Sequence, residues 1–460
     1  MFFNTSPDIA LPITVDVALL TLLGLTLEAL AKRRKPWQIP ALIIYATTGL
    51  WYFTEIVSTP EKFVDVSSSV ISTGYLQVII FLAAFRLLVP SLTHKLINRP
   101  PIIVPSLPTP KPERLLWVLS SIWLILLLYG LSRMNWDVAQ ALFPLTARRG
   151  LLLFGRAGGA AAGLTGFIVS SAGYIYSLVC AFFGVLFFFQ KRFTYKFANL
   201  ALFLISSPFF LLSGTRNSFL AVVMPGFLTY LLVSRQKWWL KVIVSLCLYT
   251  AIDYAFSVVI SYRNVGFTSF FQGLAETGQL QDVESRHLGL DMLQELFYIN
   301  QFYDQGVLTL QYGRDYLVDA LNVIPRAIWP EKPLLGLEYN LLRGKGGAVN
   351  DIGVSATISA GFIGRGIINF GPWLGPLAPA LLMALWAALL SMLWSQRYSI
   401  LRLGLFLIGL GITPNLGRDI TLLVLWPFVF GYMLVLYLER REKKRIAKLY
   451  NANFANYHQL

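Results

Sequence analysis

The sequence predicts an all-α polytopic membrane protein with about eleven transmembrane helices and a large helical loop on the extracytoplasmic side. Hydrophobic residues make up 56% of the 460 residues, charged residues make up only 13%, and the mean hydropathy is +0.62. A soluble globular domain carries about 25% charged residues. Apolar runs of about 20 residues, the length that crosses the hydrocarbon core, recur along the whole chain.

Eleven apolar segments are the predicted crossings. They cover approximately residues 9–31, 39–58, 70–90, 114–132, 158–189, 197–213, 218–233, 239–260, 372–396, 398–414 and 420–438. Basic residues gather in alternate connections, which the positive-inside rule assigns to the cytoplasm. They are Lys32 to Lys35, Lys95, Arg99, Lys111, Arg114, Lys191, Arg192, Lys196, Arg235, Lys237, Lys241, Arg397 and Arg402. This alternation predicts an N-terminus outside, a C-terminus in the cytoplasm and eleven crossings.

The connections divide the chain into four parts. Residues 1–260 form a membrane domain with eight helices and a Pro-rich cytoplasmic linker at 91–113. Residues 261–371 form the large extracytoplasmic loop, 372–438 the last three helices, and 439–460 a basic cytoplasmic tail. Loops of this length are usually functional. Apolar residues at helical spacing predict a stripe in the loop, formed by Leu288, Met292, Leu296, Ile299 and Tyr303.

Arginines are frequent on the predicted outer side, where the positive-inside rule disfavours them. Two of them, Arg216 and Arg418, lie in the short polar segments 213–217 and 415–419. We predict that these segments are tight turns at the outer membrane surface. The planar, permanently charged guanidinium suits bidentate phosphate binding. We therefore predict a site for a lipid diphosphate and its glycan, formed by Arg216, Arg263, Arg326, Lys332, Arg365 and Arg418. The alternative is that each pairs with a loop carboxylate or a phospholipid phosphate.

Four charged residues lie inside apolar spans: Glu28, Glu55, Arg86 and Asp253. A charge within a membrane is costly and is therefore either functional or paired. Structural pairing is the favoured interpretation for all four.

His287 is the one histidine, of three in the chain, that the topology places outside. On a helix, Glu284, His287 and Asp291 share one face, because they are spaced by three and four residues. A carboxylate that orients an imidazole is suited to act with it as a general base. These three residues are the predicted catalytic group, and the alternative is a solvated helix face. The scarcity of histidine argues against a metal site, and no nucleotide or dinucleotide motif occurs, so no metal and no cofactor are predicted.

Three segments within the predicted loop or at its end resemble a known family. Residues 325–333, PRAIWPEKP, resemble the PR-x-x-W-P-x-K-P signature of Wzy-type O-antigen and oligosaccharide repeat-unit polymerases. Residues 355–357 (SAT) and 364–375 (GRGIINFGPWLG) resemble the S-x-T and N-F-G-x-x-G stretches of that family. The turns at Arg216 and at Arg418 also resemble family turns. The likeness is concentrated in residues 261–419.

The resemblance implies a metal-independent inverting glycosyltransferase with a GT-C-like fold in the bacterial inner membrane. Both donor and acceptor would be undecaprenyl-diphosphate-linked glycans on the outer leaflet, and the product would be O-antigen, capsule or exopolysaccharide. Arginines would neutralise the departing diphosphate, while Trp329 and Tyr339 would stack on sugar rings or simply lie at the interface. A chain-length regulator, a flippase and membrane lipids are the implied partners, and no nucleic acid is expected.

Three alternatives remain open at this stage. An O-antigen ligase would use the same donor with a lipid A core acceptor. A transporter or flippase of lipid-linked glycan would need broken central helices and charges deep in several spans. A non-catalytic membrane subunit would explain the hydropathy but not the outer arginines.

Overall fold

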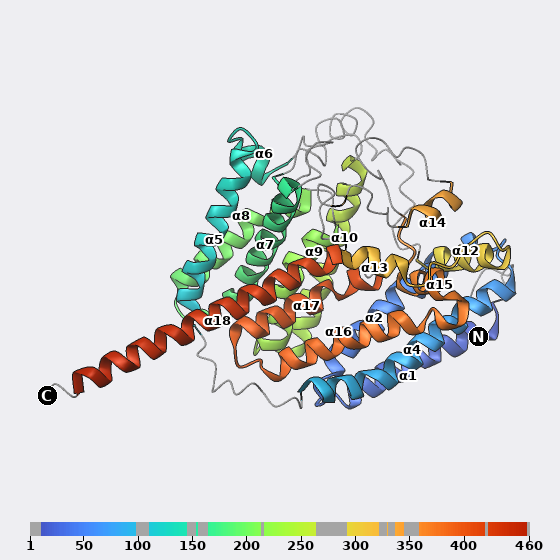
Figure 1. The fold of residues 1–460 in the computed structure, drawn as a ribbon, viewed down its shortest axis with the longest axis horizontal. Helices are drawn as coiled ribbons and strands as arrows, with labels where there is room; N and C mark the ends of the chain where they lie inside the picture. The colour runs from blue at the N-terminus through green and yellow to red at the C-terminus, as the bar shows by residue number, and fades with distance from the viewer. Residues whose placement is uncertain are drawn as a thin grey trace. The chain divides into compact units, whose positions relative to one another are not determined.

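Helices are the only regular elements in the part of the chain that the computed structural model describes (Figure 1). That part comprises residues 11–97, 110–144, 153–154, 164–212, 216–263, 292–321, 329, 336–344, 358–418 and 422–457. The helices are α1 (Ile13–Ala31), α2 (Gln38–Tyr52), α3 (Thr54–Ser58), the 3-10 helix η1 (Pro60–Phe63), α4 (Ser68–Ile97), α5 (Pro112–Ser132), α6 (Val138–Leu142), α7 (Leu164–Phe187), α8 (Phe193–Leu212), α9 (Arg216–Val233), α10 (Trp238–Arg263), α12 (Met292–Asp304), α13 (Arg314–Ala320), α14 (Leu337–Leu342), α15 (Phe362–Leu374), α16 (Leu377–Ser395), α17 (Ile400–Arg418) and α18 (Leu422–Tyr457). The predicted all-helical class is confirmed for these residues.

Each predicted membrane span overlaps at least one of these helices. Within the described ranges, six helices are long and apolar enough to cross a membrane: α1, α4, α5, α8, α16 and α17. Helices α7, α9 and α10 contain shorter apolar stretches. These helices support the predicted multi-pass membrane protein. The count of eleven crossings and the sides of the two termini stay predictions.

Some helix boundaries differ from the predicted ones. The span predicted at 39–58 consists of two helices, α2 and α3, which meet at Phe53. Helix α4 has 30 residues and extends into the predicted linker at 91–113. Helix α18 has 36 residues and continues through most of the basic tail. Hydropathy marks where the apolar residues stop, but a helix continues as long as its backbone hydrogen bonds are satisfied.

Arg402 lies inside α17, not in the basic connection where the sequence placed it. Its side chain is buried and makes two hydrogen bonds of 2.9 Å to the two carboxylate oxygens of Glu439 on α18. A bidentate pair of this kind satisfies both charges away from water. The sequence therefore overcounted the exposed basic residues of that connection by one.

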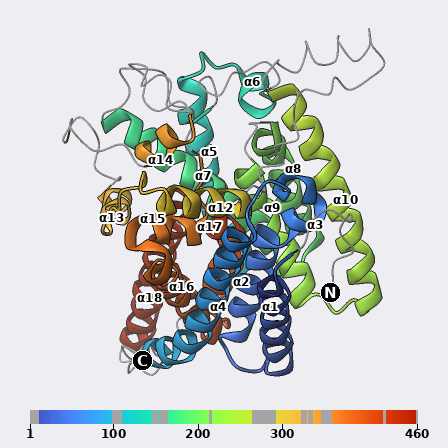
Figure 2. The ribbon, with the colours of Figure 1, turned by 90° about the vertical axis from the view of Figure 1, so that its right-hand side faces the viewer.

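Two compact units make up the chain, and each is described by itself. Unit 1 comprises Met1–Pro101, Arg286–Ser395 and Thr413–Val424. In unit 1, α4 packs along α1 and α16, and α12 packs on α2, α4 and α15 (Figure 2). Residues of the predicted outer loop are thus packed directly on residues of the predicted membrane helices.

An aromatic core joins these two parts of unit 1. The ring of Phe362 lies 4.7 Å from that of Phe81 and 5.4 Å from that of Tyr52, measured between centroids. Phe297 on α12 packs against Tyr75 at 6.4 Å. All five side chains are buried, and edge-to-face pairs of this kind add stability beyond the area that they bury. The core therefore anchors α12 and α15 to α2 and α4.

A buried amide pair, Gln77 and Asn300, also ties α4 to α12. Each side-chain amide donates to the oxygen of the other, at 2.7 and 2.9 Å. We expect Gln77→Leu to lower the free energy of unfolding by about 1–3 kcal/mol, because it leaves the Asn300 amide buried without this partner. The double variant with Asn300→Leu should lose less than the sum of the single variants. Thermal unfolding in detergent measures all three, and strictly additive losses would contradict the coupling.

The predicted apolar stripe of the outer loop is confirmed where the structure describes it. Met292, Leu296 and Ile299 on α12 are all buried, and Tyr303 is half-buried. Leu288 lies outside the described residues.

Helix α15 is kinked at Gly371, which has a φ of +81° and is followed by Pro372. Glycine adopts this conformation without steric cost. Past the kink the backbone folds back, so that Gly375 stands against Gly366 with no space for a side chain between them. The sequence predicted the start of a membrane helix at residue 372, whereas the structure places this boundary inside one kinked element.

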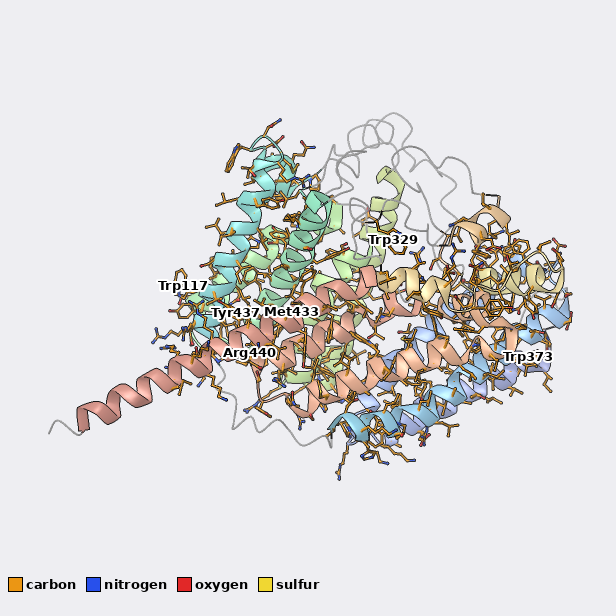
Figure 3. The ribbon with its side chains drawn as sticks, in the orientation of Figure 1. Trp117, Trp329, Trp373, Met433, Tyr437 and Arg440 are labelled. Carbon is orange, nitrogen blue, oxygen red and sulfur yellow. The ribbon has the colours of Figure 1, made fainter. Side chains whose placement is uncertain are left out.

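Unit 2 comprises Ile102–Ser285, Gln396–Ile412 and Leu425–Leu460. Helix α7 packs on α5, α8 and α9 around a core that includes Tyr176, Cys180 and Phe210. The outside of α5 and α18 carries exposed side chains that are apolar or aromatic: Trp117, Met433 and Tyr437 (Figure 3). Such a surface fits contact with lipid.

Three of the four charges within predicted spans are paired, as expected. Arg86 on α4 makes hydrogen bonds of 2.8 and 2.5 Å to the carboxylate of Glu28 on α1. Glu55 is 2% exposed, accepts from the backbone N–H of Gln294 at 3.2 Å and lies 3.5 Å from Lys62. The side chain of Asp253 lies outside the described residues.

Candidate functional site

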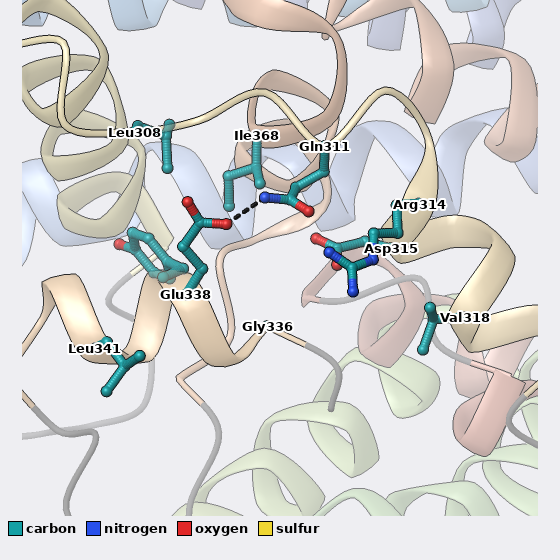
Figure 4. Close-up of a pocket in the computed structure, with 10 residues that line it drawn as sticks. Leu308, Gln311, Arg314, Asp315, Val318, Gly336, Glu338, Leu341 and Ile368 are labelled. Carbon is teal, nitrogen blue, oxygen red and sulfur yellow. Dashed lines mark hydrogen bonds between the residues drawn. The ribbon is translucent and has the colours of Figure 1, made fainter. Parts of the chain in front are cut away.

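A cavity of about 420 Å³ lies in unit 1, within the predicted outer loop (Figure 4). It is lined by the segment before α13, the first turns of α13, helix α14 and one residue of α15. The described lining residues are Leu308, Gln311, Arg314, Asp315, Val318, Gly336, Glu338, Tyr339, Leu341 and Ile368. Its volume falls in the range of small-molecule sites, about 300–1,000 Å³.

The segment that precedes α13 is fixed by α15. The backbone N–H groups of Gln311 and Tyr312 donate to the carbonyl oxygens of Ile368 and Asn369, at 3.0 and 2.9 Å. The side-chain oxygen of Asn369 accepts from the backbone N–H of Asp315 at 3.3 Å. Ile368 and Asn369 belong to the 364–375 stretch that carries the family resemblance. That stretch therefore shapes one wall of the cavity, mainly through its backbone.

Glu338 is held across the cavity by two side chains. The hydroxyl of Thr309 and the side-chain amide of Gln311 each donate to one of its carboxylate oxygens (Figure 4 shows the bond from Gln311). A carboxylate fixed in this way loses little rotamer freedom when it accepts a further hydrogen bond.

Arg314 is the cationic residue of the described lining. It is exposed, and its guanidinium makes no hydrogen bond or ion pair with any residue that the structure describes. The guanidinium therefore keeps its donors for water or a ligand.

Behind the cavity, Tyr339 belongs to a buried polar network. Its hydroxyl donates to the carboxylate of Glu295, which also receives hydrogen bonds of 3.0 and 3.1 Å from Arg343. The guanidinium of Arg343 lies 3.7 Å from the ring centroid of Tyr298. Burial, followed by the nearby charge of Glu295, raises the pKa of Tyr339 well above its ordinary value. The phenol therefore stays a donor at any physiological pH, and the network fixes α14 on α12.

The predicted stacking residues have different surroundings. Tyr339 is 3% exposed, so it presents only a small part of its surface to the cavity. Trp329 is half-buried, and its neighbours on both sides lie outside the described residues. Stacking on sugar stays a prediction for both side chains.

Arg365 is committed to a buried ion pair. It is 4% exposed, and its guanidinium lies 3.5 Å from the carboxylate of Asp319 and 3.4 Å from the carbonyl oxygen of Asp315. Its guanidinium carbon also lies 5.5 Å from the ring centroid of Tyr316. These contacts correspond to the alternative in which an outer arginine pairs with a loop carboxylate.

Arg418 is the last residue of α17, so residues 415–418 are not the turn that the sequence predicted. Asn415 and Leu416 are buried, and Gly417 packs so closely on Thr47 that only glycine fits. The carbonyl oxygen of Arg418 accepts a hydrogen bond of 3.0 Å from the hydroxyl of Ser359. The helix extends to Arg418 because Gly417 allows close packing on α2. A cation at the C-terminus of a helix also interacts favourably with the helix dipole.

The side chains of the other predicted site residues lie outside the described part of the structure. Glu284, His287, Asp291, Arg326 and Lys332 lie outside the described residues. Arg216 begins α9 and Arg263 ends α10, but the structure does not describe their side chains. Whether these groups converge on one pocket stays a prediction.

Two lining residues were not selected from the sequence. Arg314 was one of many outer arginines with no motif around it, and Glu338 had no partner at helical spacing. Both line the cavity because Thr309 and Gln311 bind Glu338 from 29 and 27 residues away in the chain, and no local pattern encodes such contacts.

A scan against protein families, a search of curated proteins and a search of solved structures found no match to this chain.

Proposed function

We propose that this chain polymerises undecaprenyl-diphosphate-linked oligosaccharide repeat units on the outer leaflet of the bacterial inner membrane. The proposal rests on the resemblance of 325–333 and 364–375 to Wzy-type polymerases. The single structural observation that supports it most is the cavity that Arg314, Asp315 and Glu338 help to line, because one of its walls is built on the 364–375 stretch. Eleven crossings, with the N-terminus outside and the C-terminus in the cytoplasm, would put this cavity on the outer side.

The chemistry is a glycosyl transfer between two lipid-linked glycans. A hydroxyl oxygen of the acceptor forms a bond to the anomeric carbon of the donor as the bond from that carbon to the diphosphate oxygen breaks. The diphosphate leaves with the electron pair, and the hydroxyl proton passes to a base, for which His287 and the loop carboxylates are the candidates. Outer arginines such as Arg326 would stabilise the charge that develops on the departing diphosphate.

Loss of the gene should reduce lipid-linked glycan to single repeat units. A ligase would instead leave long chains on the carrier, and a flippase would leave single units on the cytoplasmic side. Gel separation of the lipid-linked glycan measures its chain length. Labelling of the glycan in intact and in permeabilised cells shows on which side of the membrane it lies, so the two measurements together distinguish the three functions. Long stranded chains would contradict the polymerase assignment.

Arg314→Ala, expressed in the deletion strain, should lower polymer at least about tenfold, because a charge-assisted hydrogen bond to the substrate is lost. Arg133→Ala is the matched control, since Arg133 is an exposed arginine of a predicted outer loop and does not line the cavity. Polymer quantity is compared at equal membrane level of each protein. Equal polymer from both variants would show that the cavity plays no part in the reaction.

A further inference from the structure

A pocket of about 80 Å³ lies in unit 2, between the start of α5 and the part of α18 that follows its apolar residues. Its lining includes Arg114, Leu115 and Val118 of α5 and Leu438, Arg441 and Glu442 of α18. The guanidinium of Arg114 donates a hydrogen bond of 2.6 Å to the carboxylate of Glu442, which joins the two helices at this point. In both helices the sequence changes here from apolar to charged residues. The pocket therefore has an apolar side and a charged side.

Positive charge is in excess among the lining residues. Glu442 accepts from Arg114 and also from Arg445, at 3.1 Å, so its negative charge is already compensated. Arg441 is exposed, and its guanidinium makes no hydrogen bond or ion pair with any residue that the structure describes. A guanidinium in this state keeps its donors for a ligand.

Further cations lie next to Arg441 on α18. They are exposed and likewise have no ion pair with the described residues: Arg440, Lys443 and Lys444. The segments of the chain that continue from the pocket, 98–109 and 448–460, contain no acidic residue. The local charge therefore favours an anionic ligand.

The size of the pocket limits which part of a ligand it holds. Sites that enclose a whole small molecule have volumes of about 300–1,000 Å³, so this pocket holds a single chemical group. A phosphate group is the anion that the planar fork of an arginine suits best. The rest of the ligand must then lie on the surface of the two helices, outside the pocket.

That surface is apolar and carries aromatic side chains beside the pocket. Trp117 on α5 is 67% exposed and Tyr437 on α18 is 59% exposed (Figure 3). Such rings settle at the level of the lipid headgroups in a membrane. Further along α5, Leu124, Ile125 and Leu128 are also exposed, and they continue the apolar surface away from the charged residues.

We propose that this pocket binds the headgroup phosphate of an anionic phospholipid, with an acyl chain along the exposed side of α5. Basic pockets between membrane helices are suited to acidic lipid headgroups. The cationic headgroup of a zwitterionic lipid would instead face Arg441 and the cations next to it. This lipid site does not depend on the proposed polymerase function, so either can fail without the other.

The test uses the full-length protein in detergent and phosphatidylglycerol that carries a photoactivatable acyl chain. Trypsin cleaves after Arg114 and Arg133 and releases residues 115–133, which contain nearly all of α5. Mass spectrometry measures the label on this peptide, and unlabelled lipid is added as competitor. We expect labelling of 115–133, with phosphatidylglycerol competing at least about tenfold better than phosphatidylcholine.

Arg441→Gln should weaken the binding of phosphatidylglycerol at this peptide about tenfold, because a charge-assisted hydrogen bond to the phosphate is lost. Arg441→Glu should weaken it further. Arg441 is exposed and has no described partner, so both variants should keep the unfolding midpoint of the lipid-free protein. Arg235→Gln is the matched control, since Arg235 is an exposed arginine of another basic connection in unit 2 and does not line the pocket. It should leave the labelling unchanged.

Glycerophosphoglycerol, the same headgroup without acyl chains, separates a lipid site from a site for a soluble phosphate. It should fail to compete even at a hundredfold excess, because it cannot cover the apolar surface of α5. Competition as strong as that of the whole lipid would overturn the assignment to a lipid. Equal competition by phosphatidylcholine, unchanged labelling in both variants of Arg441, or an equal loss in Arg235→Gln would also overturn the proposal.

Discussion

Gly366→Ala is expected to prevent stable accumulation of the protein in the membrane. A Cβ atom at position 366 would overlap the carbonyl oxygen of Gly375 and would lie 2.9 Å from both the carbonyl carbon of Gly375 and Cδ of Pro379. Two of these three atoms belong to the backbone and the third to a proline ring, so no change of rotamer can relieve the clash. Overpacking of this kind costs about 3 kcal/mol or more, which is a large part of a typical folding free energy of about 5–15 kcal/mol.

Gly24→Ala is the matched control for this substitution. Gly24 lies in α1, and a Cβ atom there would have no other atom within 4 Å. In a helix, alanine is favoured over glycine by about 0.5–1 kcal/mol, so this variant should be at least as stable as the natural chain. Membrane level and the unfolding midpoint in detergent, followed by size-exclusion chromatography, measure both variants. The same midpoint in the two would mean that Gly366 and Gly375 do not pack as closely as described.

The clash at Gly366 would also disturb the cavity. The helix that carries Gly366 presents Ile368 to the cavity, and its backbone holds Gln311 in place. A shift of α15 would therefore move one wall of the candidate site. The glycines of this stretch therefore have a structural role beside the cavity. Glycine allows the backbone to fold back on itself at Gly371, which sets the position of α15.

The helices were predictable from the sequence because each depends on a local property. A run of apolar residues is sufficient to favour a membrane helix, since every backbone group must be satisfied within the segment. The stripe of Met292, Leu296 and Ile299 was predictable for the same reason, because the period of a helix is fixed. The ends of α4, α17 and α18 were not, because hydropathy does not mark where a helix ends.

Charge pairing was predictable only as a tendency. That Glu28 and Arg86 would be paired follows from the cost of an unpaired charge in a membrane. The identity of the partner does not follow, because two paired residues can lie far apart in the chain. Arg402 and Glu439, for example, are 37 residues apart. The same limit explains the site: outer arginines could be recognised as a class, but hydropathy could not distinguish Arg365, which is buried, from Arg314, which lines a cavity.

Loss of either member of the Arg365–Asp319 pair is expected to lower the free energy of unfolding by about 3–5 kcal/mol, because one buried charge loses its partner. Both side chains are less than 10% exposed, and both belong to unit 1. Arg365→Met and Asp319→Leu should each be strongly destabilising. The double variant should recover most of the loss, since well-packed apolar residues can replace a buried ion pair at little cost. Arg445→Met is the control, because Arg445 is 50% exposed and its pair with Glu442 should contribute less than about 1 kcal/mol.

Polymer produced by the double variant decides the role of Arg365. If Arg365 acts only through the fold, polymer should return together with the unfolding midpoint, because the position of α15 is restored. If the guanidinium binds the diphosphate, stability should return without polymer. Asp319 and the carbonyl oxygen of Asp315 hold the guanidinium against α13, so we expect the first result. Recovery of stability with less than about a tenth of the normal polymer would instead restore Arg365 to the diphosphate site, because the loss of an interaction made only in the transition state lowers the rate without lowering stability.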